Sequence, residues 1–180
     1  MRNSILPARI GDSGPATVDE PTLIEFAVVM TAPSVADLSE LRRRRHKLRT
    51  AIINLEQCLA APAIGDDENW RLRVHGSVEA VLADFREHVA LTEGSDGFHQ
   101  DVLASAPHLT GAVERLVRDH ARVAARIDAL LALTAGDADR VAPAEIRGDG
   151  TDLINALMKH RQLGADLVFD AFETDIGGSG

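Results

Sequence analysis

The chain has 180 residues, of which 45% are hydrophobic and 26% are charged, and its formal net charge is −9. This composition is typical of one globular domain with a sizeable core, and it excludes a wholly disordered chain. The negative charge argues against nucleic acid or an anionic membrane as the main partner, and the single cysteine excludes an intrachain disulfide. No apolar run approaches the roughly 18 residues that span a membrane, and none has the features of a signal peptide, so we expect a cytoplasmic protein.

Residues 1–33 differ from the rest of the chain. Glycines and prolines punctuate them, and their one apolar segment is Leu23–Val29. Such a pattern favours irregular backbone near a terminus. We therefore expect a mobile N-terminal arm over residues 1–33 and a single domain over residues 34–178.

Two long helical patterns follow the arm. Ser34, with Asp37 three residues later, is a variant of the capping box, and the first helix should end at Pro62. The second helix should begin at Asp66 or Asp67. Apolar residues recur every three or four positions along both helices, as on the buried face of a helix. The first face holds Leu38, Leu41, Leu48, Ile52, Leu55 and Leu59, and the second holds Trp70, Val74, Val78, Val81, Leu82, Phe85 and Val89.

The second half of the chain repeats this pattern. A short helical piece over residues 101–104 should precede a third long helix over about residues 109–133. Glycines and a proline across residues 135–150 predict a long connection, so the fourth helix should begin near Thr151 or Asp152. Four long helices with short or moderate connections predict an all-α, up-down-up-down four-helix bundle. The last two apolar faces hold Val113, Leu116, Val117, Val123, Ile127, Leu130 and Leu131, then Leu153, Leu157, Leu167, Val168 and Ala171.

Four of the seven histidines fall one on each expected long helix, namely His46, His88, His120 and His160. The last three share the apolar face of their helices, whereas His46 falls toward the edge of its face. Imidazole is costly to bury unless it is hydrogen-bonded or bound to a metal, so three or four rings in one core can meet at a transition metal ion. Each ring can equally be a separate, hydrogen-bonded polar residue.

Four segments of the chain have the same order and spacing as segments of one known protein family. They are Phe85–Gly94, Ala106–Leu109, Val113–His120 and His160–Gly178. They resemble the hemerythrin-like proteins, also called HHE cation-binding domains, and the resemblance covers about residues 36–178. It implies a four-helix bundle that binds non-haem iron, with an oxygen- or redox-related role and dioxygen as a small ligand. The positions that match the family's ligands are His88, His120 and His160, with His46 as a weaker match.

The chain departs from this family at the carboxylates. The family places a carboxylate four or five residues after the histidines of its second and fourth helices, where it bridges two iron ions. Here Thr92 lies four residues after His88, and Gly164 lies four residues after His160. Glu93 and Asp166 are the nearest substitutes. In a regular helix Glu93 must turn inward by more than about 100° from the direction of His88, and Asp166, six residues after His160, meets a similar difficulty. A mononuclear site, a modified site and no metal all remain open, and Gly164 leaves a gap that can hold water or a small ligand.

Two functions from different classes follow. The first is a metal-binding protein with iron as its ion, His88, His120 and His160 as ligands, and His46 and Glu93 as further candidate ligands. The second is a metal-free bundle that acts as an interaction or regulatory module, with the arm docking onto a protein partner or a second copy of the chain. An enzyme ranks last, because the pattern positions no nucleophile or general base.

The other polar residues suggest simpler expectations. Asp119 and His120 are adjacent, so on a helix they point about 100° apart and form no dyad with each other. The basic run Arg42–Arg45 should be solvated and paired with acidic neighbours such as a carboxylate of the second helix, and Cys58 should be a buried thiol. Three histidines on a polar face or near loops are expected to have no role: His75, His99 and His108.

Overall fold

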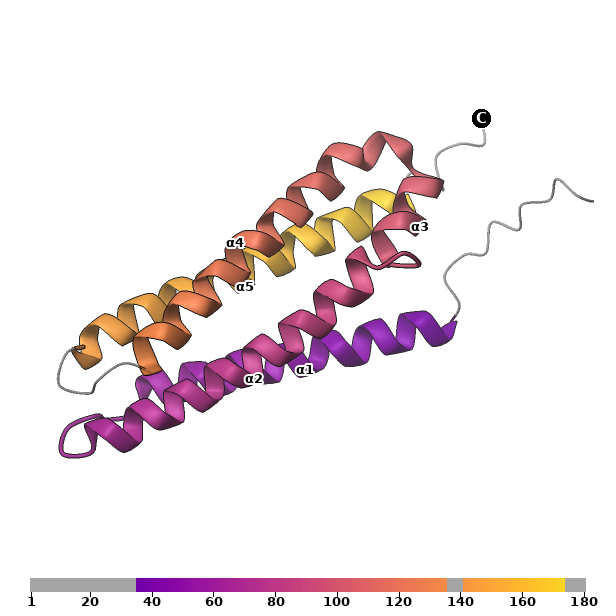
Figure 1. Ribbon diagram of the computed structural model, residues 1–180. Coiled ribbons are helices and arrows are strands. Elements are labelled where there is room, and N and C mark those ends of the chain that lie inside the picture. Colours follow the sequence, from indigo (N-terminus) through magenta and orange to yellow (C-terminus); the bar gives the residue numbers. More distant parts are fainter. Residues whose placement is uncertain (1–34, 136–140, 174–180) are drawn as a thin grey trace, which may run out of the picture. The chain divides into compact units, whose positions relative to one another are not determined.

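The computed structural model describes the backbone of residues 35–135 and 141–173 and the side chains of residues 43–135 and 141–171 (Figure 1). These residues form helices and no strand, which confirms the all-α class. The expected N-terminal arm and the Ser34 cap lie outside the described residues. The elements are α1 (Val35–Ala60), α2 (Asp67–Glu93), α3 (Phe98–Ser105), the 3-10 turn η1 (Pro107–Leu109), α4 (Thr110–Ala135) and α5 (Pro143–Glu173).

The four long helices pack side by side. Helix α1 packs against α2 and α5, and α4 packs against the same two helices (Figure 1). This arrangement is compatible with a helical bundle. None of the described helices combines the length and the apolar character that a membrane span requires.

Two hydrophobic clusters fill the interior between the helices. The larger one contains the largest fully buried side chains, including Trp70, Phe85 and Leu55. The smaller one lies where α3 and η1 meet α4 and α5, and its buried members are Val102, Ala106, Leu109, Val113, Leu116 and Leu167. The apolar faces expected from the sequence supply most of the larger cluster, but only half of the buried members of the smaller one, namely Val113, Leu116 and Leu167.

The predicted buried face of α4 is incorrect at one residue, Val117. Val117 is 39% exposed, although its neighbour Leu116 is buried. Apart from Asp119, the buried positions of α4 alternate in steps of three and four residues, which keeps a narrow stripe facing one direction, and Val117 lies one residue outside it. That stripe consists of Val113, Leu116, His120, Val123, Ile127, Leu130 and Thr134.

The expected start of the fourth helix is also wrong. Helix α5 begins at Pro143, so the second half of the connection expected over residues 135–150 is helical. A proline at the first position of a helix breaks no hydrogen bond, because the first backbone N–H groups have no partner within the helix. Gly148 and Gly150 therefore lie inside the helix, where glycine is normally unfavourable by about 1 kcal/mol relative to alanine.

Contacts with the end of α1 hold this first part of α5 in place. The guanidinium of Arg147 donates to the carbonyl oxygens of Leu59 and Ala61, both at 2.9 Å, and lies 4.7 Å from the ring centroid of Trp70. A Cβ atom added to Gly150 would lie 2.5 Å from a methyl carbon of Leu59, so glycine permits the close approach of the two helices. Packing thus overrides the low helix propensity of glycine at this position.

The two glycines of α5 give a matched test of this close approach. We predict that Gly148→Ala raises the free energy of unfolding by about 0.5–1 kcal/mol, because Gly148 is exposed with nothing near its added Cβ. Gly150→Ala should be less stable than Gly148→Ala by at least about 1 kcal/mol, since buried Leu59 must move. Urea unfolding of both variants measures the difference, and equal stabilisation would show that α5 does not approach α1 this closely.

Candidate metal centre

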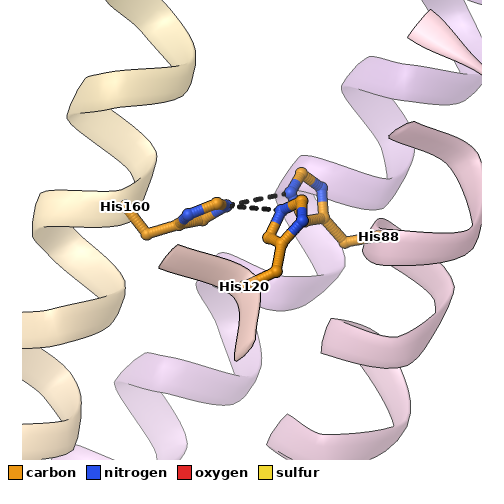
Figure 2. A group of neighbouring side chains, drawn as sticks. All are labelled: His88, His120 and His160. Atoms are coloured by element: carbon orange, nitrogen blue, oxygen red, sulfur yellow. Dashed lines mark hydrogen bonds between the residues drawn. The ribbon is translucent and has the colours of Figure 1, made fainter. Parts of the chain in front are cut away.

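Three histidine rings from three helices converge in the interior, as Figure 2 shows. His88 belongs to α2, His120 to α4 and His160 to α5. The last two are each 4% exposed, and His88 is half-buried. The Nε2 atom of His160 lies 3.1 Å from Nε2 of His88 and 3.1 Å from Nε2 of His120. One ligand nitrogen from each ring lies within 4.8 Å of the other two, so the group can hold a metal ion.

An aromatic ring borders the histidine cluster on its apolar side. Phe85 lies one helical turn before His88 on α2 and is 1% exposed. Its ring centroid lies 6.2 Å from that of His88, 5.7 Å from that of His120 and 5.9 Å from that of His160. Phe85 therefore contacts all three rings, limits their movement and keeps water away from one side of the cluster.

Carboxylates hold two of the rings from behind. Nδ1 of His160 donates to Oδ2 of Asp119 at 3.0 Å, and Nδ1 of His120 donates to Oε1 of Glu93. Asp119 is 9% exposed, and the side chain of Glu93 is 31% exposed. An ionised carboxylate only accepts hydrogen bonds, so each Nδ1 carries the proton and each Nε2 presents a lone pair.

In these tautomers two nitrogen lone pairs face each other, and a cation bound between them would remove the repulsion. With both Nδ1 atoms protonated, Nε2 of His120 and Nε2 of His160 face each other at 3.1 Å as two acceptors without a proton between them. Two nitrogens bound at about 2.0–2.1 Å to one ion, at angles near 90–110°, would lie about 2.9–3.4 Å apart. The observed separation therefore fits two imidazoles of one transition metal ion.

The surroundings of the rings keep them neutral. Burial, reinforced by the neighbouring histidines, lowers the pKa of His88 and of His120 to about 3. Burial also lowers the pKa of His160, although its hydrogen bond to Asp119 opposes that change. Neutral imidazole is the form that binds a metal ion, so the three rings are ready to coordinate at physiological pH.

The structure brings together three of the five candidate ligands. His46 is exposed on α1 and is not part of the group of three rings. The carboxylate of Glu93 contacts Nδ1 of His120, on the side of the ring away from the other two Nε2 atoms. Thr92 donates its hydroxyl to the backbone carbonyl oxygens of His88 and Val89, so this position supplies no bridging group.

Sequence reasoning missed two residues of the site. Asp119 forms no dyad with adjacent His120, as expected, but it pairs with His160 on another helix, and no local pattern signals such a contact. His99 was expected to have no role, yet it is buried in the first turn of α3 and its ring stacks on that of His120 at 6.0 Å. The steps of three and four residues from His99 to Val102 and Ala106 could have indicated its burial.

Two further predictions from the sequence concern the basic run Arg42–Arg45 and Cys58. Arg44 of the basic run forms an ion pair with Glu87 on α2, which confirms pairing with a carboxylate of the second helix. Cys58 is half-buried instead of buried, because it lies beside the Leu55 and Leu59 face of α1 and not on it.

Comparison with known proteins finds no matching family model, no matching curated protein and no matching solved structure. The resemblance to hemerythrin-like proteins therefore stays a prediction.

We predict that the metal-free protein loses stability as the pH falls. The folded-state pKa values of His88 and His120 lie below the value of about 6.5 expected in the unfolded chain, so between about pH 6.5 and 3 the unfolded chain binds protons that the folded chain does not. Stability conferred by the neutral rings is present above about pH 6.5 and is lost progressively below it. Urea unfolding in chelator at pH 7.5, 6.5 and 5.5 should give a falling midpoint.

Two variants show whether the buried rings cause this pH dependence. His88→Gln should flatten the decline, and His108→Gln, which changes an exposed imidazole of η1, should leave it as in the parent chain. An unfolding midpoint that stays constant or rises toward pH 5.5 in the parent chain would contradict burial of neutral histidines.

Proposed function

We propose that the chain is a hemerythrin-like protein of up-down-up-down topology that binds one non-haem transition metal ion through Nε2 of His88, His120 and His160. The observation that carries this proposal is the 3.1 Å separation of two Nε2 atoms whose rings are both held by carboxylates at Nδ1. Imidazole suits iron, zinc, copper and nickel, and the family resemblance favours iron among them.

The charges near the cluster suit a divalent ion. The three rings are neutral, and Asp119 and Glu93 each contribute one negative charge directly behind a ring. A divalent cation at the Nε2 atoms would therefore be balanced within the interior, without bulk water supplying the compensation. The same carboxylates make the two imidazoles more basic and better donors to the ion.

The proposed centre is mononuclear. The positions where the family carries bridging carboxylates are Thr92 and Gly164 here, and neither offers an anionic oxygen. Three nitrogen ligands do not fill the coordination shell of iron, so positions stay open for an external ligand. An open position on a redox-active ion supports the oxygen- or redox-related role that the resemblance implies.

We predict that His160→Ala removes the metal and that His46→Ala does not. His160 contributes the nitrogen nearest to both other rings, whereas exposed His46 lies outside the group. After reconstitution with ferrous iron and dialysis, elemental analysis should find close to one ion per chain in the parent and in His46→Ala, and well below one in His160→Ala.

A thermal measurement separates this proposal from its rival, the metal-free interaction module. Chelator should lower the melting temperature of the parent chain and of His46→Ala, since a ligand that binds only the folded state stabilises it. Chelator should leave His160→Ala unchanged. A parent chain that holds no metal and does not respond to chelator would favour the interaction module.

We also predict that the supporting carboxylate sets the affinity for the metal. Asp119→Asn should weaken binding about 10–100-fold, because the ring of His160 loses the negative charge that orients and polarises it. Asp128→Asn, an exposed change on the same helix, is the matched control and should bind as the parent does. Competition titration against a chromophoric chelator measures both constants, and equal affinities would show that Asp119 has no part in the site.

A further inference from the structure

A cavity of about 660 Å³ lies between α1 and α5 and reaches His88 and His160. Its size falls within the range of about 300–1,000 Å³ that is usual for small-molecule sites in proteins. Gly164 lines it, and apart from its chain neighbours and the backbone of its own helix no atom lies within 4 Å of the place where a Cβ of this residue would be. The gap expected beside His160 is thus part of a larger opening.

One end of this cavity is cationic. Arg45 and Arg49 lie one turn apart on α1, and Arg161 follows His160 on α5. Within residues 43–135 and 141–171, no carboxylate forms an ion pair with any of these three guanidinium groups. Arg45 is exposed at its surface, but partial desolvation lowers its pKa, and among the described side chains no carboxylate compensates this guanidinium. Such a group favours an anionic ligand, because arginine forms paired hydrogen bonds with planar oxyanions.

The other end of the cavity is apolar. It is lined mainly by Ile52 and Ile53 from α1 and by Ile154, Leu157 and Met158 from α5, and Glu56 is the one carboxylate of the lining at this end. Ile53 is 41% exposed and Met158 is 44% exposed, which is high for large apolar side chains that flank a cavity.

The direction of the two helices separates these ends. Arg147, near the start of α5, bonds to carbonyl oxygens at the end of α1, so the two helices run in opposite directions along the cavity. Residues 52–56 of α1 therefore lie toward residues 154–158 of α5, and residues 45–49 lie toward residues 160–165. The arginine side chains thus lie at one end of the cavity, and most of the large apolar side chains lie at the other end.

We propose that this cavity binds a small amphipathic carboxylate, with its carboxylate held by Arg45, Arg49 and Arg161 and its alkyl chain lying between Ile52, Ile154 and Leu157. The carboxylate end then lies beside His88 and His160. The arginines and the apolar lining exist without any metal, so this binding does not require the proposed metal centre.

Decanoate is the probe that tests this proposal, by isothermal titration calorimetry on the full chain in chelator and again with ferrous iron. Decanoate should bind saturably with one molecule per chain. Hexanoate should bind at least about tenfold more weakly, since it buries fewer methylene groups. Decyltrimethylammonium, with the same chain length and the opposite charge, should show no saturable binding.

Two kinds of variant locate the binding. Arg49→Gln and Arg161→Gln change exposed side chains and should each weaken decanoate binding about tenfold or more. Gly164→Leu should abolish binding by filling the cavity, and Gly148→Leu, a change at an exposed glycine of the same helix, should not. If Gly164→Leu fails to fold, the arginine variants still decide the question.

The outcomes separate this proposal from the metal proposal. Decanoate binding in chelator by a chain that never holds iron supports the carboxylate site and contradicts the metal centre. Normal iron loading without saturable decanoate binding overturns the carboxylate site alone. Equal affinity for decanoate and decyltrimethylammonium, or arginine variants that bind as the parent does, would also overturn it.

Discussion

The interior of this protein depends on one constraint, which is that buried imidazoles must stay neutral while their lone pairs face one another. Burial drives the pKa of His88 and His120 far below the usual range. Placing an additional proton between two of these ring nitrogens is therefore unfavourable, because it would charge a buried ring. Asp119 and Glu93 hold the Nδ1 protons of two rings and thereby direct two Nε2 lone pairs to the same place. A metal cation would satisfy these lone pairs without charging any ring.

The fold provides a rigid frame for this arrangement, because His120 and His160 each lie between the two hydrophobic clusters along their helices. His120 lies between Leu116 of the smaller cluster and Val123 of the larger one, and His160 lies between Leu157 and Leu167 in the same manner. Each helix is thus fixed by close packing on both sides of its histidine. This packing supports the 3.1 Å separations of Nε2 of His160 from Nε2 of His88 and of His120, a spacing that suits a metal ion.

Local patterns predicted the parts of this structure that depend on one helix at a time. The spacing of apolar residues gave four long helices and placed His88, His120 and His160 on their inner faces, because burial repeats with the helical period. These patterns could not predict contacts between different helices. The pairing of Asp119 with His160 depends on how two helices lie against each other, and the early start of α5 depends on Gly150 meeting Leu59. His46 and Glu93 show the same limit, since the helical angle alone did not fix their surroundings.

X-ray absorption spectroscopy at the iron edge, on the chain reconstituted with one equivalent of ferrous iron, tests the central claim most directly. The account predicts nitrogen neighbours at about 2.0–2.2 Å, outer-shell scattering that corresponds to three imidazoles, and no iron–iron distance near 3.5–4 Å. A first shell of oxygen alone, without imidazole scattering, would contradict coordination by the three histidines. A clear iron–iron distance would contradict a mononuclear centre.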